Sequence, residues 1–413
     1  ESKRNKILLS AYACEPNKGS EPGIGWNWAI TLNELGYNVT VVTRANNKVN
    51  IDKIVSENKK LETIQFEYYD LPSFLFKRKK MMGVHLYYEL WQKGLLNYVK
   101  NNINPDNYDI VHHITFGVFR QPSRLHELNK PFVFGPLGGG ETIPKLLLAG
   151  LPYKYRCIEF IRTTLNKLSL KRLSLKNCLN HADIIFTRTN ETKSYIPNKF
   201  IEKTKVKIDI GLFPDEISKE IKKLETEKVK TILYVGRLTY WKGLELAIRS
   251  FHLFNKQHPN SIFTIIGSGK YRQEMENLTH ELEIANKVNF VGQIPQLELF
   301  DHYKNATAFL FPSLHDAGPL VTLEALRVGL PIVTLNIGGL GQILKANYPT
   351  IVNSQNFDKE ETISSLSQFL LKLSTEKDFY AKCSGRSLSI ANENTWAKTV
   401  ASVYTDITEV LNA

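Results

Sequence analysis

Short apolar segments alternate with segments of helical periodicity along nearly the whole chain. The apolar segments are rich in Val, Ile, Leu and Phe and are as short as typical buried strands. Such alternation favours parallel sheets in which successive strands are connected by helices. The sequence therefore predicts an α/β fold. The expected strands are Lys6–Tyr12, Asn38–Thr43, Ile64–Tyr68, Asp109–His113, Pro131–Phe134, Asp183–Thr187, Thr231–Val235, Ile262–Ile266, Val288–Val291, Ala308–Phe311 and Pro331–Leu335.

Helical patterns fill the gaps between these strands. They cover about 23–36, 82–102, 155–180, Gly243–Lys256, Tyr271–Ile284 and Leu297–Lys304, and a helical tail from Glu376 breaks near 392–396. The alternation stops in a charged stretch from about Lys205 to Lys230 and then starts again. Because 413 residues exceed one typical core, we predict two domains, 1–205 and 206–390, followed by a helical segment, 391–413.

The net charge of +12 is concentrated in one half of the chain. Residues 1–205 contain 31 Lys and Arg against 18 Asp and Glu, whereas the remainder contains 22 against 23. Two segments, 74–100 and 145–177, mix basic residues with aromatic and aliphatic ones, which favours contact with an anionic membrane surface. A nucleic acid is not expected as partner because no binding motif for one is present, and a solvated helix face is the ordinary alternative. The expected membrane contacts are Lys77, Arg78, Lys79, Lys80 and Trp91.

The remaining composition favours a cytoplasmic setting. No apolar run approaches the roughly 20 residues of a membrane span, and no signal peptide is expected ahead of the first strand. The four cysteines show no C-x-x-C spacing, which argues against a zinc site and against a disulfide scaffold. Together with the basic segments, this predicts a peripheral protein on the inner face of the cytoplasmic membrane.

The stretch from Phe311 to Gly339 combines a strand, a loop, a helix and a second strand. Backbone N–H groups at the helix start, near Pro319, can bind anionic oxygens. Glu324, in the first turns of the helix, can accept hydrogen bonds from ribose hydroxyls, and Asp316 on the loop can hold sugar hydroxyls. The pattern predicts a site for a phosphorylated sugar; the alternative is an ordinary strand–loop–helix with two solvated acids. The expected contacts are Asp316, Ala317, Gly318, Pro319, Leu320 and Glu324.

A basic pair follows the first strand of the second half. In Gly236-Arg-Leu-Thr-Tyr-Trp-Lys-Gly243, Arg237 and Lys242 lie on the loop that leaves this strand. Two such cations can converge on a diphosphate and stabilise it as a leaving group. Alone they would be ordinary surface charges, but together with Asp316 and Glu324 they favour a nucleotide-diphosphate site.

A glycine-rich segment, Gly19-Ser-Glu-Pro-Gly-Ile-Gly-Trp26, follows the first strand and opens a helix. It lacks the G-x-G-x-x-G spacing, so a dinucleotide site is disfavoured. Its loop carboxylate, Glu21, is a candidate ligand contact. The alternative for the whole segment is a turn followed by a helix N-terminus.

Two further strand ends have polar or glycine-rich residues. Asp109-Ile-Val-His-His-Ile-Thr-Phe-Gly117 ends one strand. Because neighbouring strand residues face opposite sides, only one of its histidines can reach a ligand; His113 is favoured, and His112 is kept as a candidate. Core and capping histidines are the alternative. The next strand leads into Gly135-Pro-Leu-Gly-Gly-Gly-Glu141, whose glycines allow close backbone approach to a ligand or a hinge. The expected ligand contacts here are Gly138, Gly139 and Glu141.

Taken together, these motifs resemble the retaining glycosyltransferases of family GT4, which have the GT-B fold. The 316/324 pair resembles the family's E-x7-E region with Asp in place of the first Glu, and 236–243 is similar to its G-R-x4-K-G. The resemblance implies two facing Rossmann-like domains and a C-terminal helix that crosses back to the N-terminal domain, with Trp396 as its anchor.

The same resemblance implies roles for further residues. It implies that the acceptor is contacted by Glu21, Gly138, Gly139 and Glu141. Gly23 and Gly25 would let the backbone approach the donor phosphates, and Gly267 and Gly292 would lie near the nucleotide. A histidine after the fourth strand would lie beside the transferred sugar, and Thr115 would occupy the place of the family's second histidine.

The resemblance implies a retaining transfer from a nucleotide-diphospho sugar, most simply a UDP-sugar, to a lipid-linked or membrane-held glycan in bacterial surface polysaccharide assembly. No metal or other cofactor is expected, because no pair of acids follows a strand as in D-x-D. No oligomeric state is predicted. Two alternatives stay open, a non-catalytic GT-B partner subunit and a sugar-nucleotide epimerase.

Overall fold

The computed structural model describes residues 6–73, 75, 83–225 and 229–412, and these form two compact units. Unit 1 comprises Glu1–Gly140, Thr163–Ile210 and Trp396–Ala413, and unit 2 comprises Glu141–Arg162 and Gly211–Thr395. The expected boundary near residue 205 thus lies at 210 in the structure. The larger difference is the segment 141–162, which precedes that boundary in sequence and nevertheless packs with unit 2.

Unit 1 contains a seven-stranded sheet in which all pairs of strands are parallel. The strand order is β3-β2-β1-β4-β5-β6-β7, so the direction of winding changes between β1 and β4. In open sheets of this kind, ligands bind outside the carboxyl ends of the strands at this switch point. The strands are β1 (Lys6–Ala11), β2 (Asn38–Thr43), β3 (Gln65–Tyr68), β4 (Ile110–Thr115), β5 (Phe132–Leu137), β6 (Ile184–Thr187) and β7 (Thr204–Val206).

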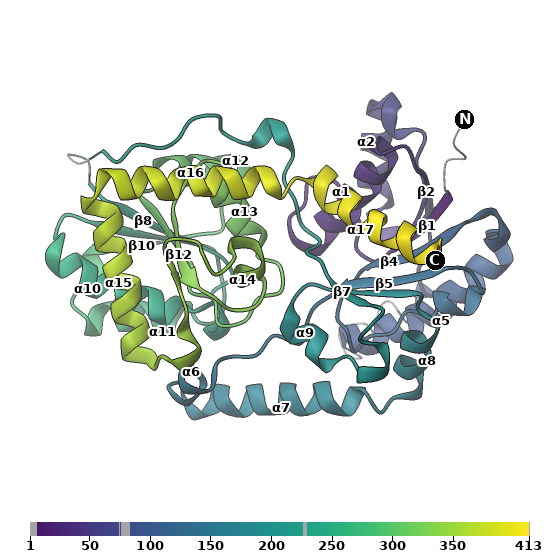
Figure 1. Cartoon of the computed structure of the whole chain (residues 1–413), viewed down its shortest axis with the longest axis horizontal. Coiled ribbons are helices and arrows are strands. Elements are labelled where there is room, and N and C mark those ends of the chain that lie inside the picture. Colours follow the sequence, from purple (N-terminus) through teal and green to yellow (C-terminus); the bar gives the residue numbers. More distant parts are fainter. Residues whose placement is uncertain (1–5, 74, 76–82, 226–228, 413) are drawn as a thin grey trace. The chain divides into compact units, whose positions relative to one another are not determined.

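Helices connect these strands, as the alternating sequence pattern predicts (Figure 1). Where one helix was expected at 155–180, two occur, because a turn at Leu170–Arg172 separates them. The helices of unit 1 are α1 (Ser20–Glu34), α2 (Lys48–Glu57), α5 (Val84–Asn102), α8 (Leu173–His181), α9 (Asn190–Tyr195) and α17 (Trp396–Leu411), and α7 (Tyr153–Ser169) begins in unit 2 and ends in unit 1.

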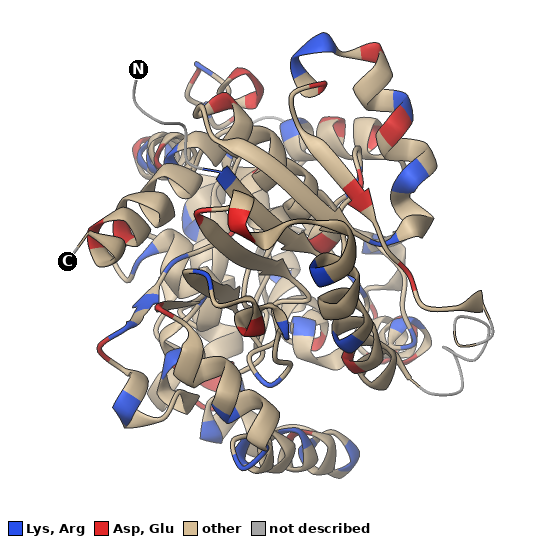
Figure 2. Ribbon diagram, turned by 90° about the vertical axis from the view of Figure 1, so that its right-hand side faces the viewer, with Lys and Arg blue, Asp and Glu red and all other residues tan. Residues whose placement is uncertain are grey.

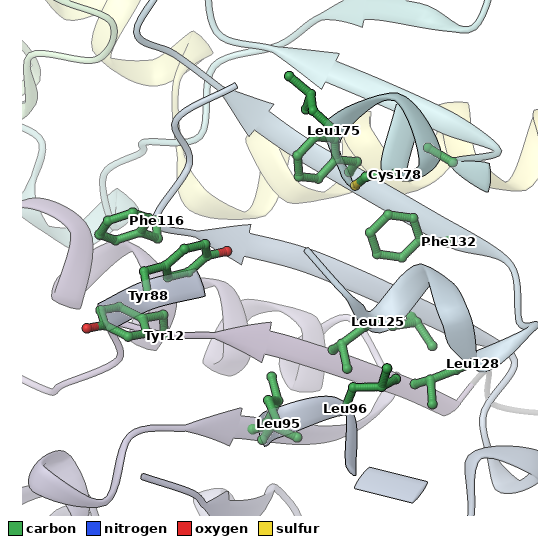
Figure 3. Close-up of a cluster of buried hydrophobic side chains, with 14 of the residues drawn as sticks. Tyr12, Tyr88, Leu95, Leu96, Phe116, Leu125, Leu128, Phe132, Leu175 and Cys178 are labelled. Carbon is green, nitrogen blue, oxygen red and sulfur yellow. The ribbon is translucent and has the colours of Figure 1, made fainter. Parts of the chain in front are cut away.

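The core of unit 1 corrects one membrane prediction. Trp91 of α5 is completely buried, its Nε1 donates to the carbonyl oxygen of Tyr69 at 3.0 Å, and its ring meets Tyr12 edge-on at 5.0 Å. Tyr88, one turn earlier, stacks on Phe116 at 4.1 Å in the cluster of Figure 3. The aromatic residues of α5 therefore form core contacts and do not face a membrane. Lys77, Arg78, Lys79 and Lys80 lie outside the described residues.

Unit 2 has a six-stranded parallel sheet with the order β10-β9-β8-β11-β12-β13, which switches between β8 and β11. Its strands are β8 (Thr231–Val235), β9 (Ile262–Ile266), β10 (Val288–Gly292), β11 (Ala308–Leu310), β12 (Ile332–Leu335) and β13 (Ile351–Val352). Its helices are α6 (Lys145–Ala149), α10 (Leu244–Gln257), α11 (Arg272–Glu281), α12 (Gln296–Asn305), α13 (Leu320–Leu326), α14 (Gly338–Leu344), α15 (Lys359–Thr375) and α16 (Lys377–Glu393). The predicted α/β class is therefore confirmed in both units.

The C-terminal helices are separated at Asn394 and Thr395, where the sequence predicts a break. α16 packs in unit 2, whereas α17 packs on α1 in unit 1 (Figure 1). Thr399 Oγ1 donates to the carbonyl oxygen of Ile210 at 3.2 Å, and Lys205 pairs with Asp406 at 2.9 Å. Trp396, the first residue of α17, is buried. Among the described helices, none is long and apolar enough to cross a membrane.

Candidate functional site

Three loops that follow β8, β11 and β12 meet at the switch point of unit 2. Leu314 N and Ser313 Oγ both donate to the carbonyl oxygen of Trp241, at 2.8 and 3.2 Å, which joins the loops after β8 and β11. Gly339 N donates to the carbonyl oxygen of Asp316 at 2.7 Å, which adds the loop after β12. All the residues that the sequence predicts for donor binding in the second half thus follow strands of one sheet.

Gly243 shows why this junction needs a glycine. Its φ is +70°, and a Cβ atom there would lie 1.8 Å from the carbonyl oxygen of Pro312. Any other residue would separate the loop that contains Lys242 from the loop that contains Asp316.

Lys242 and Asp316 form an ion pair across this junction. Both side chains keep slight exposure, 13% and 15%. The neighbouring Arg237 is exposed on the same loop as Lys242. Asp316 is partly exposed, as are Ala317, Gly318 and Leu320, while Pro319 caps α13 and is buried. The structure therefore presents two cations and one carboxylate at the carboxyl end of β8 and β11.

Glu324 lies inside α13, as predicted, and is largely buried. Its Oε2 accepts a hydrogen bond of 3.0 Å from the hydroxyl of Tyr303 on α12. Burial raises the pKa of the Glu324 carboxyl, while the hydrogen bond from Tyr303 and the charge of Arg327 act in the opposite direction. Tyr303 holds one carboxylate oxygen, so the ribose contact predicted for Glu324 would fall to the other.

Gly267 and Gly292 end β9 and β10 in close contact with neighbouring backbone. Gly267 has a φ of +134°, and a Cβ there would lie 1.9 Å from the carbonyl oxygen of Gly236. Gly292 has a φ of +88° and accepts a 2.8 Å hydrogen bond from Gly267 N. Close packing explains Gly267 and the positive φ explains Gly292, and the contact of either glycine with a nucleotide stays a prediction.

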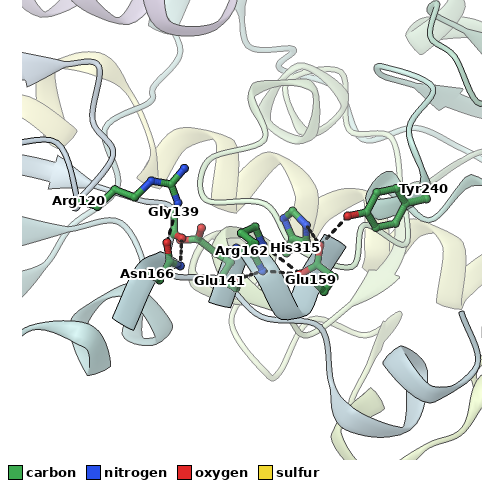
Figure 4. Close-up of polar contacts among 8 residues, drawn as sticks. All are labelled: Arg120, Gly139, Glu141, Glu159, Arg162, Asn166, Tyr240 and His315. Atoms are coloured by element: carbon green, nitrogen blue, oxygen red, sulfur yellow. Dashed lines mark hydrogen bonds and ion pairs between the residues drawn. The ribbon is translucent and has the colours of Figure 1, made fainter. Parts of the chain in front are cut away.

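A buried carboxylate that belongs to none of the sequence motifs contacts the loops after β8 and β11. Glu159 of α7 accepts hydrogen bonds from Tyr240 at 2.8 Å, from His315 at 3.1 Å and from Arg162 at 2.7 Å (Figure 4). Its side chain is only 4% exposed. Although burial favours the neutral acid, the hydrogen bonds and charges of His315 and Arg162 lower the pKa of Glu159 to about 2.

This carboxylate contacts the loops after β8 and β11 within two positions of Lys242 and Asp316. Tyr240 precedes Lys242 by two positions, and His315 immediately precedes Asp316. The ring of His315 also stacks on Trp241, with centroids 5.7 Å apart. Glu159 was visible in the sequence only as the single acid of the basic segment 145–177, and that isolation was the available signal.

Glu141, predicted as an acceptor contact, also belongs to unit 2. It is buried, its carbonyl oxygen accepts a 2.6 Å hydrogen bond from Arg162, and its Cγ lies 3.3 Å from where a Cβ of Gly338 would be. The structure thus places Glu141 against the start of α14 and close to the backbone of Asp316, within unit 2, whereas the other predicted acceptor residues belong to unit 1.

In unit 1, the predicted acceptor residues gather where β1, β4 and β5 end. Glu21, in the first turn of α1, accepts a 3.2 Å hydrogen bond from Gly117 N and is partly exposed. Beneath it, Arg188 pairs with the fully buried Asp209 at 2.6 Å and lies 4.0 Å from Glu21. This charge cluster was missed from the sequence, because Arg188 and Asp209 belong to no motif.

The glycines of the same region have mainly steric roles. Cβ atoms at Gly23 and Gly25 would lie 2.0 Å from the carbonyl oxygen of Lys18 and 2.1 Å from that of Ala13. Both glycines are buried in the first turns of α1. Gly138 is also buried, with its N–H bonded to Gly117, whereas Gly139 is partly exposed. A close approach of α1 to its own loop therefore explains Gly23 and Gly25 without a ligand.

The predicted roles of His112, His113 and Thr115 require correction. All three are completely buried within unit 1. His112 contacts the carbonyl oxygen of Gly135 at 2.7 Å and the hydroxyl of Tyr404 at 3.0 Å. His113 packs on the other side of the sheet, against Tyr88.

The physical reason is that helices cover both faces of the sheet in unit 1. His112 and His113 point to opposite faces of the sheet, and because both faces are covered, neither side chain reaches the surface. Thr115 Oγ1 accepts a 2.9 Å hydrogen bond from Ala13 N and so fixes the loop after β1. In addition, the register between β1 and β4 shifts, so that Ser10 pairs with His113 and Ala11 with Thr115. The contacts of all three residues are therefore structural.

Because His112 and His113 are buried, we expect unit 1 to lose stability at acidic pH. Burial lowers the pKa of His112 to about 4 and that of His113 to about 3, the latter also through His112. The unfolded chain therefore binds more protons below its histidine pKa of about 6.5. The contribution of the two neutral histidines to stability is therefore fully present above that pH, and it is lost as pH falls toward their pKa values in the folded state. From about pH 7 to about pH 5.5, we expect the free energy of unfolding to fall by about 2 kcal/mol through this pair.

Urea denaturation across this pH range tests the expectation. A His112→Gln variant removes one of the two groups and should show about half of this loss, whatever its stability at neutral pH. An unchanged pH dependence in the variant would contradict the assignment.

Among the described residues, no three His, Cys, Asp or Glu side chains gather in a manner suited to a metal ion. The absence of a metal requirement stays a prediction. Near the switch point of its sheet, the described part of unit 2 thus has the Lys242–Asp316 pair, the exposed Arg237 and the largely buried Glu324.

Comparison with known proteins agrees with this geometry. The model of the family described as glycosyl transferases group 1 matches residues 216–384, which lie in unit 2. An uncharacterized glycosyltransferase of Methanocaldococcus jannaschii is 27% identical over 300 residues, 67% of this chain and 72% of that protein. A GDP-mannose-dependent alpha-(1-6)-phosphatidylinositol monomannoside mannosyltransferase of Mycolicibacterium smegmatis is 24% identical over 276 residues, 61% of this chain and 72% of that protein.

Among solved structures, Anabaena HepE in complex with UDP superposes with a TM-score of 0.59 over 99% of both chains, at 15% identity. A glycosyltransferase of Rickettsia africae superposes with a TM-score of 0.63, also over 99% of both chains, at 17% identity. At such identities the superpositions show the fold alone. The chain is thus similar to the glycosyl transferases of group 1 over residues 216–384, and as a whole it has the GT-B fold of these solved structures.

Proposed function

We propose that this protein transfers a sugar from a nucleotide-diphospho sugar to a hydroxyl group of a membrane-held glycan, with retention of anomeric configuration. The observation that carries the proposal is the Lys242–Asp316 pair beside the exposed Arg237, at the switch point of the sheet in unit 2. Two cations suit the diphosphate, and Asp316 suits hydroxyls of the donor sugar.

The nucleotide proposed first is uridine diphosphate. HepE, which shares the fold, was solved with UDP, whereas the mycobacterial relative is named for GDP-mannose. Glu324, whose second carboxylate oxygen is not used by Tyr303, is proposed to accept hydrogen bonds from the ribose. The ribose is common to all these donors, so this contact supports a nucleotide donor without selecting the base.

The proposed chemistry is a substitution on one face of the sugar, without a covalent enzyme intermediate. The bond between the anomeric carbon and the phosphate oxygen breaks, and the acceptor oxygen bonds to the same carbon from the same face. The acceptor proton passes to the departing phosphate oxygen. Arg237 and Lys242 stabilise the charge that develops on the diphosphate, in a site where such interactions are stronger than in water. No metal is required in this scheme.

The acceptor is proposed to be a lipid-linked glycan precursor at the inner face of the cytoplasmic membrane, in bacterial surface polysaccharide assembly. The basic excess of the first half of the chain supports contact with an anionic membrane surface, and the mycobacterial relative is named for a phosphatidylinositol mannoside. In unit 1, Glu21 and Gly139 are the predicted acceptor residues that remain partly exposed.

Calorimetric titration of the full chain with UDP-, GDP-, ADP- and CMP-sugars in the presence of EDTA tests the donor site. One class is expected to bind with micromolar affinity. Arg237→Ala and Glu324→Ala should each weaken binding about 10- to 100-fold, since each removes hydrogen bonds to a charged group. Arg386→Ala, on α16, is the matched control and should bind the donor normally.

Failure of all four classes would overturn the proposal and favour a non-catalytic partner subunit. Normal binding by Glu324→Ala would contradict the ribose contact alone.

A further inference from the structure

The helix α7 exposes its apolar side and buries polar residues, whereas an ordinary surface helix buries its apolar side. The side chains exposed along one face are Tyr153, Ile158, Phe160, Ile161, Leu165 and Leu168, of which Tyr153 and Phe160 are 77% and 73% exposed. Ile158, Ile161, Leu165 and Leu168 follow the spacing of a single helical face. The polar residues Glu159 and Asn166 lie on the buried side.

The buried polar side of α7 holds the helix in this orientation. Glu159 binds Tyr240, His315 and Arg162, as described above. Two turns later, Asn166 Nδ2 donates to the carbonyl oxygen of Gly139 at 2.8 Å, and its Oδ1 accepts from Arg120 at 2.6 Å (Figure 4). Rotating α7 to bury its apolar side would leave these buried polar groups without partners, which is costly. The outward apolar face is therefore fixed by the structure.

Charge indicates what covers this face. Arg156, Lys167 and Lys171 are exposed on or just after α7, and no acid besides the buried Glu159 occurs between residues 145 and 177. In Figure 2 the helices at the bottom of the view are mostly tan, and their charged segments are mainly blue. Exposed apolar and aromatic side chains bordered by basic ones suit the boundary between lipid headgroups and acyl chains. A second copy of the chain would instead oppose like charges across a symmetric contact.

We infer that the outward face of α7 docks on an anionic lipid surface, with Ile158, Phe160, Ile161 and Leu165 entering the headgroup boundary and Arg156 and Lys167 meeting anionic headgroups. This rests on the proposed function only in placing the enzyme beside a membrane-held acceptor. It differs from the surface expected at residues 77–80 and Trp91, because Trp91 is core. α7 thus has two roles, since its buried side supports the donor loops through Glu159 and its exposed side binds lipid.

Sedimentation of the full chain with vesicles tests this surface. Binding to vesicles of equal parts phosphatidylcholine and phosphatidylglycerol is expected to be at least tenfold stronger than binding to phosphatidylcholine alone. The triple variant Phe160→Ser, Ile161→Ser, Leu165→Ser should lower binding to the mixed vesicles at least tenfold. The double variant Arg156→Gln, Lys167→Gln should lose most of the preference for the anionic lipid, together with much of the salt dependence.

The matched control replaces three apolar residues that are exposed to a similar or greater extent elsewhere, Val49→Ser, Ile221→Ser and Leu297→Ser, and should bind vesicles like the wild type. Equal binding by the α7 triple variant and this control would overturn the inference. So would a wild-type dimer, seen by light scattering, that the α7 variant alone dissociates, because a second copy would then cover the face. Donor titration separates the two proposals. The α7 triple variant should keep wild-type donor affinity. If the wild type binds no donor at all, the proposed function fails, but the vesicle result still tests the lipid-binding face of α7.

Discussion

Replacing Lys242 by methionine is expected to lower kcat/KM about a thousandfold. Methionine keeps much of the length of the side chain and removes only its charge. Removing one preorganised group that stabilises transition-state charge typically costs a factor of about 10²–10³, and here the loss also leaves Asp316 without its cationic partner. The measurement is the rate of nucleoside diphosphate release from the donor class that the titrations identify. The effect should appear mainly in kcat, because the charge on the diphosphate develops as the bond breaks.

Two further variants sharpen this test. Lys345→Met removes a lysine that pairs with Glu393 at 3.1 Å on the surface of unit 2, with its side chain 61% exposed, and should leave the rate unchanged. Lys242→Arg keeps the charge and should recover part of the lost rate. A Lys242→Met enzyme with nearly normal kcat would show that this lysine only holds Asp316 and does not act on the leaving group.

The fold was largely predictable because its strands are short, apolar and separated by helices. Asn38–Thr43, Thr231–Val235 and Ile262–Ile266 were predicted residue for residue. The edge strands β7 and β13 were not, because strands of three and two residues are too short to show a period. The segment 141–162 could not be assigned to unit 2 from sequence, since its position depends on contacts with residues more than 80 positions away, such as Tyr240 and His315.

The structure brings the residues predicted for the donor in the second half of the chain together at one sheet edge, whereas it buries several of those predicted for the acceptor, and this has a physical reason. Arg237, Lys242, Asp316 and Glu324 lie in loops or first helical turns directly after strands, and the parallel sheet alone brings those positions to one edge. Whether a residue at such an edge is exposed depends on the helices that cover the sheet. His112 shows this, because it ends within reach of Tyr404, almost 300 residues later in the chain.

The same ambiguity explains the membrane prediction. Both α5 and α7 combine basic, aromatic and aliphatic residues, and both have helical periodicity. In α5 the aromatic face enters the core of unit 1, and in α7 the apolar face points outward. The two helices differ in which side contacts the rest of the protein. In α7 it is the polar side that forms hydrogen bonds within the protein. Composition cannot supply that information.

Loss of Glu159 should destabilise the loops that contain Lys242 and Asp316. Glu159→Gln is expected to lower the free energy of unfolding by about 3 kcal/mol at neutral pH, because it removes a buried charge bonded to Arg162 and His315. Urea denaturation measures this value. Glu274→Gln is the matched control: this glutamate pairs with Lys154 at 3.0 Å with both side chains substantially exposed, so its loss should change stability by less than about 1 kcal/mol.

Acid titration gives Glu159 an independent signature. Its pKa of about 2 lies below the value of an unfolded glutamate, about 4.3. Its contribution to stability is therefore present above about pH 4.3 and is lost as pH falls toward about 2. The wild type should lose about 3 kcal/mol over this window that Glu159→Gln does not lose. If both proteins show the same slope there, Glu159 does not stabilise unit 2 as a charge, and the hydrogen bonds to Tyr240 and His315 would be formed as well by the neutral amide. If only the wild type shows the loss, and the variant also binds the donor about tenfold more weakly, the carboxylate on the buried side of α7 positions the loops that contain Lys242 and Asp316.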